Sequence, residues 1–443
     1  MKIRGLLVAT VVFAVLAGVL YWSDHRKASA EAAKPDADAA PSILKLDENS
    51  ITQLALKRKD STPIRLTKTG SDWKITEPKL LGADQTAVTG VLSTLSALNS
   101  ERLVEGKSTG LERYGLDHPS LQLDITEKDK RTQQLLLGDD TPAGGAVYAA
   151  LAGDPRVFTV AGYQKTSLDK SLNDLRDKRL LTVSPDKISR LEIDGKNGEI
   201  EFGRNQDEWQ ILKPKPMRAD SYAVGELVSK LTDARMDLGA SDTGARESDA
   251  AFAHGTSVAH VKVTDEASTE DLQIRKNKDS YYAKSSAVQG TYKVSSDLAN
   301  ALDKKLEDFR NKKLFAFGYA EPAKLEIRGG AKSYSLLRGG QDWWDNGKKM
   351  DEEGVSSLVS NLRDLSADKF VDSGFTTADI EASVTSNDGK RVEKVLISKS
   401  GSNYIAKRDH DPALYQLSTA SVDALQKSLD GLKPAAPPGK AGK

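Results

Sequence analysis

The stretch "GSDWKITEP", residues 70–78, decides the fold because the chain writes nearly the same phrase twice more. It returns as "QDEWQILKP", residues 206–214, and as "GQDWWDNGKK", residues 340–349. The first tryptophan precedes the second by 136 residues, and the second precedes Trp343 by 134. Large aromatic side chains in strands dominate packing more often than chemistry. The phrase therefore predicts a repeated structural core, not a catalytic motif.

A capped helix after each tryptophan strand gives the best test of the repeat. An aspartate stands where a helix begins, and its side chain can accept hydrogen bonds from the unpaired N–H groups of the first turn. Apolar residues follow at offsets of 4, 7, 8 and 11, which form one stripe of a 3.6-residue period. The three sets are Asp84 with Val88, Val91, Leu92 and Leu95; Asp220 with Val224, Leu227, Val228 and Leu231; and Asp351 with Val355, Leu358, Val359 and Leu362. The chain is therefore predicted to be a triplicate.

Short strands with alternating apolar and polar residues predict an antiparallel sheet with one buried face in each module. In the first module they read "ITQLALKR", "PIRLTKTG", "DWKITEP", "LQLDITE", "QQLLLGD", "VYAALAG" and "RVFTVA". A closing helix is expected around "LDKSLNDLRDKRLL", residues 168–181. The predicted fold class is α+β: three tandem repeats of a mainly antiparallel sheet with two covering helices, after one N-terminal transmembrane helix.

The third phrase contains two adjacent tryptophans, which must point to opposite faces of a strand. The acidic residue before each tryptophan of the first two phrases aligns with Asp342 before Trp343. We therefore expect Trp343 in the core and Trp344 on the outer face.

The N-terminus predicts a membrane anchor. Lys2 and Arg4 precede residues 5–22, which carry no charge and would span about 27 Å as a helix. The alternatives are a signal peptide cut after Ala30 and a reversed anchor with a cytoplasmic body. The expected division is a membrane anchor at 1–27, a flexible spacer at 28–42, repeat modules at 43–181, 182–315 and 316–433, and a disordered tail at 434–443.

Composition excludes several classes of function. The 64 basic and 64 acidic side chains leave no net field to attract nucleic acid, so no nucleic-acid partner is expected. The chain contains no cysteine, which excludes thiol catalysis, disulfides and cysteine-based zinc sites.

Four phrases of the first module carry a family resemblance: "GSDWKITEP", "RYGLDHPSLQLDI", "LLLGDDTPAGGAVYA" and "LRDKRLL". Together they resemble domain-of-unknown-function family 4340, whose members are bacterial envelope proteins with one N-terminal membrane segment. The resemblance implies company, because such proteins are often encoded beside ABC-type export permeases and the gliding-motility type of auxiliary protein. It implies no reaction. The second module has "HGTSVAHVKV" in place of the Gly-Leu-Asp-His-Pro loop, and the third lacks that loop's Gly-Leu and Pro.

The most function-like stretch is "LGDDTPAGGAVYA", whose candidate interaction residues are Asp139, Asp140, Gly144 and Gly145. The carboxylates could bind a cation or a sugar hydroxyl, but Gly, Pro and Asp also supply the dihedral angles of a hairpin loop, the interpretation we favour. Weaker candidates are "EGKSTG" (residues 105–110) for phosphate, "SDTGA" (241–245) for aspartic-protease chemistry, His410 for a metal and "SLDK" (167–170) for a serine nucleophile. Each lacks the rest of its motif.

No coherent catalytic set, metal site or cofactor site emerges from these patterns. We expect a non-catalytic accessory or scaffold protein, tethered to lipid of the inner membrane with the bulk of the chain in the periplasm. By analogy with the family's company, its expected partner is an ABC-type exporter. The alternative is an envelope glycan-binding protein or hydrolase that uses the Asp-rich loop of the first module.

Overall fold

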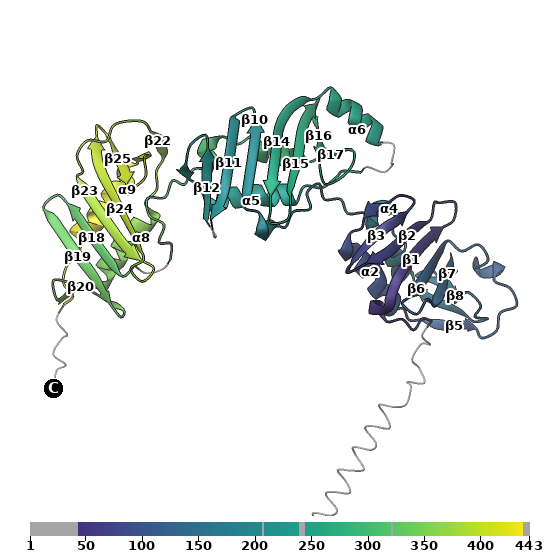
Figure 1. Cartoon of the computed structure of the whole chain (residues 1–443). Coiled ribbons are helices and arrows are strands. Elements are labelled where there is room, and N and C mark those ends of the chain that lie inside the picture. The colour runs from purple at the N-terminus through teal and green to yellow at the C-terminus, as the bar shows by residue number, and fades with distance from the viewer. Residues whose placement is uncertain (1–42, 206–207, 239–243, 320–321, 437–443) are drawn as a thin grey trace, which may run out of the picture. The chain divides into compact units, whose positions relative to one another are not determined.

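The computed structural model describes residues 43–205, 208–238, 244–319 and 322–436. The chain divides into two compact units, Met1–Lys178 and Arg179–Lys443. The first unit contains one antiparallel sheet and the second contains two (Figure 1), which confirms the α+β class and the three sheet modules. The expected anchor, residues 1–27, and spacer lie outside the described residues. Within the described ranges, no helix is both long and apolar enough to cross a membrane.

The first sheet has nine strands in the order β4-β3-β2-β1-β6-β7-β8-β9-β5. Its strands are β1 (Ile51–Arg58), β2 (Ile64–Thr69), β3 (Asp72–Glu77), β4 (Leu81–Gly82), β5 (Arg102–Glu105), β6 (Leu121–Glu127), β7 (Thr132–Asp140), β8 (Ala146–Leu151) and β9 (Val157–Ala161). Its α-helices are α2 (Gln85–Ser96), α3 (Gly162–Leu168) and α4 (Leu172–Leu175). The alternating apolar residues of the strands and the stripe of α2 share one buried core.

The second sheet repeats this order with eight strands, β13-β12-β11-β10-β14-β15-β16-β17. They are β10 (Arg190–Gly195), β11 (Gly198–Asn205), β12 (Glu208–Lys213), β13 (Met217–Arg218), β14 (Thr256–Thr264), β15 (Thr269–Asn277), β16 (Ser280–Ser285) and β17 (Thr291–Val294). The α-helices are α5 (Ser221–Thr232), α6 (Gly244–Ala253) and α7 (Ser296–Leu302).

The third sheet again has nine strands, β21-β20-β19-β18-β23-β24-β25-β26-β22. They are β18 (Lys324–Gly329), β19 (Lys332–Gly339), β20 (Asp342–Asp345), β21 (Lys348–Lys349), β22 (Lys369–Val371), β23 (Ile380–Ser386), β24 (Arg391–Ser400), β25 (Asn403–Arg408) and β26 (Leu414–Leu417). Two helices, α8 (Glu352–Asp364) and α9 (Thr419–Asp430), lie beside its strands (Figure 1). Short 3₁₀ helices occupy Glu48–Ser50, Glu112–Tyr114, Pro185–Lys187 and Leu306–Phe309.

The predicted caps and stripes are confirmed in all three modules. The Asp84 side chain accepts hydrogen bonds from the backbone N–H groups of Thr86 and Ala87, both at 3.0 Å. Asp220 caps α5 in the same way, and Asp351 accepts from Gly354 N–H at 3.1 Å. All twelve stripe residues are buried, so each helix packs on its sheet through the face that the sequence predicts.

The assignment of the tryptophans is also confirmed. Trp73, Trp209 and Trp343 are 4%, 7% and 6% exposed and belong to the three cores. Trp344 is 39% exposed on the opposite face of β20.

The closing helix of the first module differs from the prediction. Residues 168–181 were expected to be helical, but α3 ends at Leu168 and α4 covers only four residues. From Arg176 the chain is extended, because Arg176 forms a β-bridge with Ala83. Leu180 and Leu181 then belong to the core of the second sheet. The segment is therefore a linker, and the second covering helix of the first module is α3.

The strand registers define which residues are equivalent in the three modules. Leu54, Leu191 and Leu325 lie on the central strands β1, β10 and β18. Each pairs with a residue of the neighbouring strand β6, β14 or β23; these partners are Ile125, Val263 and Val384 respectively. Positions counted from these pairs are called equivalent below.

Candidate functional site

The Asp-rich loop of the first sheet forms the hairpin between β7 and β8. Thr141 N–H donates to Ala146 O at 2.9 Å, and Gly144 N–H donates to Thr141 O at 2.8 Å. Gly144 and Gly145 have φ angles of +74° and +79°, values that favour glycine. The two glycines are therefore explained by the turn that they make.

The structure places Asp139 and Asp140 in different surroundings. The Asp139 carboxylate lies against Gly115, where an added Cβ would come within 2.5 Å of it. Asp140 lines a cavity of about 470 Å³ with Gly144, Gly145, Gly162, Lys165, Thr166 and Asp169. Asp169 is also paired with Arg58. The two neighbouring carboxylates therefore do not converge on one point.

The family phrases "RYGLDHP" and "LLLGDD" interlock. A Cβ added to Gly138 would lie 2.1 Å from the backbone oxygen of Tyr114, so only glycine permits this approach. The Tyr114 ring packs 4.8 Å from the Tyr148 ring. Tyr114 and Leu116 form a small separate core with Ala150 and Val157. The loop that contains Tyr114 and Leu116 therefore covers part of β8 and β9.

The weaker candidates have other partners. Ser108 donates to the Gly110 carbonyl at 2.9 Å, and Ser167 donates to the Tyr163 carbonyl at 3.0 Å. His410 is almost fully exposed, 3.5 Å from Asp409. Part of "SDTGA" lies outside the described residues. Within the described ranges no group of three His, Asp or Glu side chains is placed to hold a metal ion.

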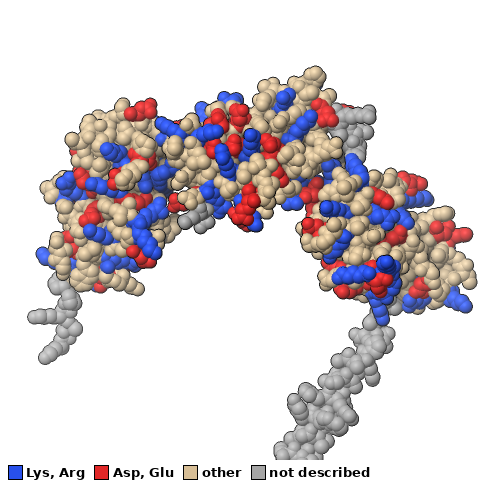
Figure 2. Space-filling view, viewed as in Figure 1, with Lys and Arg blue, Asp and Glu red and all other residues tan. Residues whose placement is uncertain are grey.

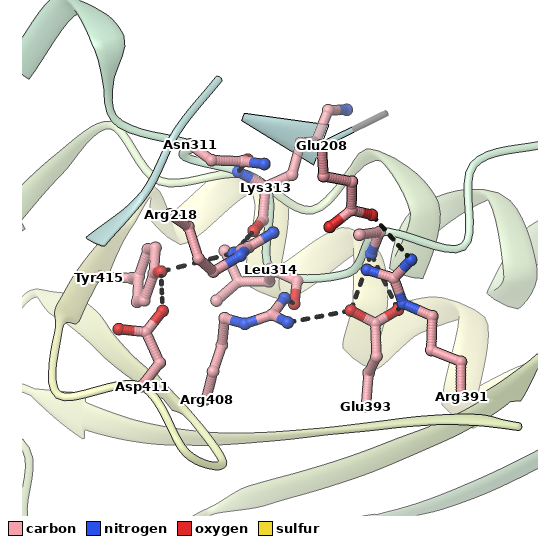
Figure 3. Close-up of polar contacts among 11 residues, drawn as sticks. Glu208, Arg218, Asn311, Lys313, Leu314, Arg391, Glu393, Arg408, Asp411 and Tyr415 are labelled. Atoms are coloured by element: carbon pink, nitrogen blue, oxygen red, sulfur yellow. Dashed lines mark hydrogen bonds and ion pairs between the residues drawn. The ribbon is translucent and has the colours of Figure 1, made fainter. Parts of the chain in front are cut away.

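Charged side chains instead gather where the chain passes from the second sheet to the third, through residues 310–317 (Figure 3). Arg310 forms a β-bridge with Ala219 of the second module, and Lys313 forms one with Ser366 of the third. Leu314 and the next residue, Phe315, are buried in the third core. The linker is therefore bonded to both modules within eight residues.

Glu393 and Arg408 of the third sheet hold this linker. The Glu393 carboxylate accepts the Ala316 N–H at 3.1 and 3.0 Å and pairs with Arg408 at 2.9 Å. Arg408 also donates to the Leu314 carbonyl. The side chains of Glu393 and Arg408 are only 5% and 11% exposed. Burial, together with the nearby Arg218, lowers the pKa of Arg408, but an arginine stays protonated in proteins. A buried ion pair of this kind stabilises the fold only when further hydrogen bonds satisfy both charged groups.

Arg218 and Tyr415 join the two modules beside this pair. Arg218 of β13 donates to the Lys313 carbonyl at 2.8 Å and to the Tyr415 hydroxyl at 3.5 Å. Tyr415 donates in turn to Asp411 at 2.6 Å. Burial first, and then the hydrogen bond to Asp411, raise the pKa of Tyr415 to about 12. The phenol is therefore neutral at ordinary pH and acts as a hydrogen-bond relay between Arg218 and Asp411.

Two further contacts complete the junction. The Arg310 guanidinium lies 3.3 Å from the ring centroid of Phe370, a stacked cation–π geometry. Arg391 pairs with Glu208 of the second sheet at 3.3 Å and with Glu393 at 3.6 Å. These contacts join the second module, the linker and the third module, and each charged side chain named here has a partner within the junction.

The second sheet receives its own linker in a similar way. Glu270, the equivalent of Glu393, accepts the Thr182 N–H at 2.7 Å and the Thr182 hydroxyl. Ser285, the equivalent of Arg408, donates to the Leu180 carbonyl. In the first sheet the registers put Gln133 and Leu151 at these positions. At the position of Glu393, a carboxylate therefore occurs in the two sheets that follow another sheet, and an amide occurs in the first.

Sequence reasoning missed this junction. Its partners are distant in sequence, 94 residues apart for Leu314 and Arg408 and 197 for Arg218 and Tyr415. One signal was available, because "LRDKRLL" and "FRNKKLF" repeat with Arg176 and Arg310 134 residues apart. That repetition corresponds to equivalent linkers, because Arg176 and Arg310 form equivalent β-bridges with Ala83 and Ala219.

The comparisons with known proteins agree with the repeat. No curated protein matches the chain. The family model described as a domain of unknown function (DUF4340) matches twice, at residues 73–251 and 209–384. Each match begins at a repeated tryptophan and ends in the following module, so the unit that the family shares includes a linker. Because the two matches together cover well over half of the sequence, the chain belongs to this family of domains of unknown function, DUF4340.

Proposed function

We propose that this chain is a non-catalytic accessory or scaffold protein of the periplasm, tethered to the inner membrane and associated with an ABC-type exporter. The observation that carries the proposal is the junction of the second and third sheets. There, buried and charged side chains bind the linker and the neighbouring module (Figure 3). Side chains committed to joining modules are typical of a protein that arranges partners in space.

The membrane tether is supported by the uncharged residues 5–22 and the polar spacer after them. Lys, Arg, Asp and Glu are interspersed over the visible surface of the sheets (Figure 2), as expected for a body that lies in water and not in lipid. The exporter as partner rests on the company of the family alone.

A pull-down from detergent-solubilised membranes, with the native N-terminal segment in place, tests the partner. We expect permease or ATPase subunits of an exporter to be captured. The matched control is Arg218→Ala with Glu393→Ala, which loosens the junction and leaves residues 1–42 unchanged; it should capture less. Capture without any exporter subunit would contradict the partner assignment.

Protease accessibility tests the location. Protease added to spheroplasts should digest the three sheets while a cytoplasmic marker survives. Protection of the sheets until the cells are lysed would favour the reversed anchor.

The cavity beside Asp140 and Lys165 favours a second candidate, an envelope glycan-binding protein or hydrolase. Asp139→Ala with Asp140→Ala tests it in the full-length chain. For a scaffold, neither calcium nor a cell-wall glycan should raise the melting temperature of the native chain more than that of the double variant. A ligand that stabilises only the native chain would make this candidate the leading one.

A further inference from the structure

The contacts between the second and third sheets define two complementary surfaces that the repeat reproduces elsewhere. The second module offers Glu208, Arg218 and Arg310, which we call a presenting end. The third module meets them with Arg391, Tyr415 and Phe370, which we call a receiving end. Since the modules are equivalent strand by strand, each of them has a counterpart of both ends.

The third sheet keeps the charges of a presenting end. Asp342 begins the tryptophan strand as Glu208 does, and the registers place Lys349 at the position of Arg218. Asp342 and Lys349 pair with each other at 2.9 Å, and both side chains remain more than 40% exposed. Pro434 bridges Met350 as Arg310 bridges Ala219, so Pro434 replaces Arg310. This end therefore offers an acid, a base and a small apolar residue in the same order.

The first sheet keeps part of a receiving end. Arg131 is equivalent to Arg391, because the next residues, Thr132 and Val392, hold the same register. Arg131 is 64% exposed, although it also pairs with Glu127 at 2.9 Å. Leu103 is equivalent to Phe370, since both pair with the aromatic residue of the neighbouring strand. Leu103 is 42% exposed.

Two of the three substituted pairs match each other, while at the position of Tyr415 the first sheet has Phe158, which is buried and has no hydroxyl to accept a hydrogen bond from Lys349. Where the junction pairs Glu208 with Arg391, the third and first sheets offer Asp342 and Arg131. Where the junction stacks Arg310 on Phe370, they offer two apolar residues, Pro434 and Leu103. Acid stays opposite base, and a cation on an aromatic ring is replaced by an apolar pair.

The outer face beside this presenting end is also unusually apolar. At one pair of equivalent cross-strand positions, the first sheet has Thr67 and Lys74, and the second sheet has Gly203 and Gln210. In the third sheet it is Leu337 with Trp344, both exposed. The second sheet has a smaller counterpart, since Leu212 lies over Gly203. Apolar side chains gathered on a surface typically mark contact with another protein.

We propose that the presenting end of the third sheet docks on the receiving end of the first sheet of a second copy of this chain. The contact is heterologous, so copies assemble head to tail and not as a twofold dimer. The pairing of Asp342 with Arg131 of the next copy repeats the ion pair of Glu208 with Arg391. The proposal is independent of the exporter and of the membrane tether.

Site-specific cross-linking of the full-length chain in detergent tests this geometry, because the sequence contains no cysteine. A flexible bismaleimide is preferable to a direct disulfide, which demands a narrow Cα separation. We expect a mixture of Asp342→Cys chains and Arg131→Cys chains to give a covalent dimer. Asp342→Cys alone and Arg131→Cys alone should stay monomeric.

Two controls bracket the result. Glu208→Cys with Arg391→Cys in one chain should cross-link internally and shows that the reagent reaches across such a junction. Lys128→Cys, in the same turn as Arg131, should not replace Arg131→Cys in the mixture. Cross-linking of Asp342→Cys with itself would overturn the proposal in favour of a twofold dimer. Absence of the mixed dimer, with the internal control positive, would also overturn it.

Charge reversal gives a second readout that needs no cross-linker. Asp342→Arg and Arg131→Asp should each weaken self-association in sedimentation velocity by about tenfold, the scale of a surface pair turned from attraction to repulsion. Mixing the two variants should restore it, and Lys128→Asp should leave it unchanged. Equal weakening by Lys128→Asp, or no recovery on mixing, would contradict the specific pair. Circular dichroism melts confirm that each variant is folded.

Discussion

The first and third sheets have equivalent cores, but different side chains contact the segment of chain that enters each sheet. In both, two consecutive apolar residues of the incoming chain are buried: Ile43 and Leu44 in the first sheet, and their counterparts Leu314 and Phe315 in the third. The third sheet adds a buried ion pair over that segment, where the first has an amide and a leucine. The first sheet also holds its incoming segment with a buried carboxylate, because the Ser50 hydroxyl donates to Glu127 at 2.8 Å. The comparison teaches that a carboxylate paired with a guanidinium is added, at positions where the first sheet has neither, where a preceding module must be held.

The second sheet lies between these two cases. Its Glu270 keeps the carboxylate, while Ser285 replaces the arginine. The acceptor for the linker N–H is therefore the common element, and the donor to the linker carbonyl varies. A buried carboxylate needs such donors, because without them it would lose its hydration and gain nothing in return.

The largest expected effect tests what the two sheets share. Trp73→Ala and Trp343→Ala should each lower the free energy of unfolding of their own sheet by about 3–5 kcal/mol, the usual cost of a large cavity. Trp344→Ala, the matched control on the outer face, should cost less than about 1 kcal/mol. Hydrogen exchange measured by mass spectrometry assigns each loss to one sheet. Similar losses for Trp343→Ala and Trp344→Ala would break the equivalence of the cores.

The tryptophans, caps and stripes could be predicted because each depends on residues close in sequence. The strands "ITQLALKR" and "LQLDITE" coincide with β1 and β6, and the Asp84 cap with its stripe defines α2. Periodicity of this kind is the strongest signal that a single sequence carries.

The closing helix and the junction could not be predicted, because distant partners decide them. The segment after Leu175 has helical spacing, but Ala83, more than ninety residues away, holds Arg176 in an extended conformation. Glu393 resembles any other charged residue of a strand until the register shows that it matches Glu270. Tertiary contacts override local preference at both places.

The next effect tests the difference between the two sheets. Glu393→Ala should destabilise the third sheet by about 3 kcal/mol, since it leaves Arg408 buried without its carboxylate and Ala316 N–H without an acceptor. Gln133→Ala at the equivalent position should cost the first sheet less than about 1 kcal/mol. Denaturant melts followed by sheet-resolved hydrogen exchange provide the measurement. Equal costs at the two positions would show that the ion pair adds nothing.

A further effect depends on pH. The folded chain raises the pKa of Tyr415 to about 12, against about 10 for an unfolded tyrosine. The neutral phenol therefore stabilises the folded state fully below pH 10, and this contribution is lost as the pH rises from 10 to 12. Two pKa units correspond to about 3 kcal/mol. The difference in stability between the native chain and Tyr415→Phe should shrink over that range, and a constant difference would contradict the assignment.

The smallest expected effect lies at the rim of the junction. Arg391→Ala removes a partly exposed pair with Glu208 and a longer contact, 3.6 Å, with Glu393, and should cost less than about 1 kcal/mol. Salt should weaken this contribution, while the buried pair of Glu393 and Arg408 should respond little. Melts of Arg391→Ala and Glu393→Ala at low and high salt make the comparison. A larger salt response for Glu393→Ala than for Arg391→Ala would contradict the assignment of the exposed and the buried pair.

Amide hydrogen exchange at the two linkers tests the central claim, that each following sheet holds the incoming chain through one carboxylate. Glu393→Ala should expose the Ala316 amide to exchange while the Thr182 amide stays protected. Glu270→Ala should do the reverse, since Thr182 N–H donates to that carboxylate at 2.7 Å. Unchanged protection of both amides in both variants would contradict the claim, because the linkers would then be held by apolar burial alone.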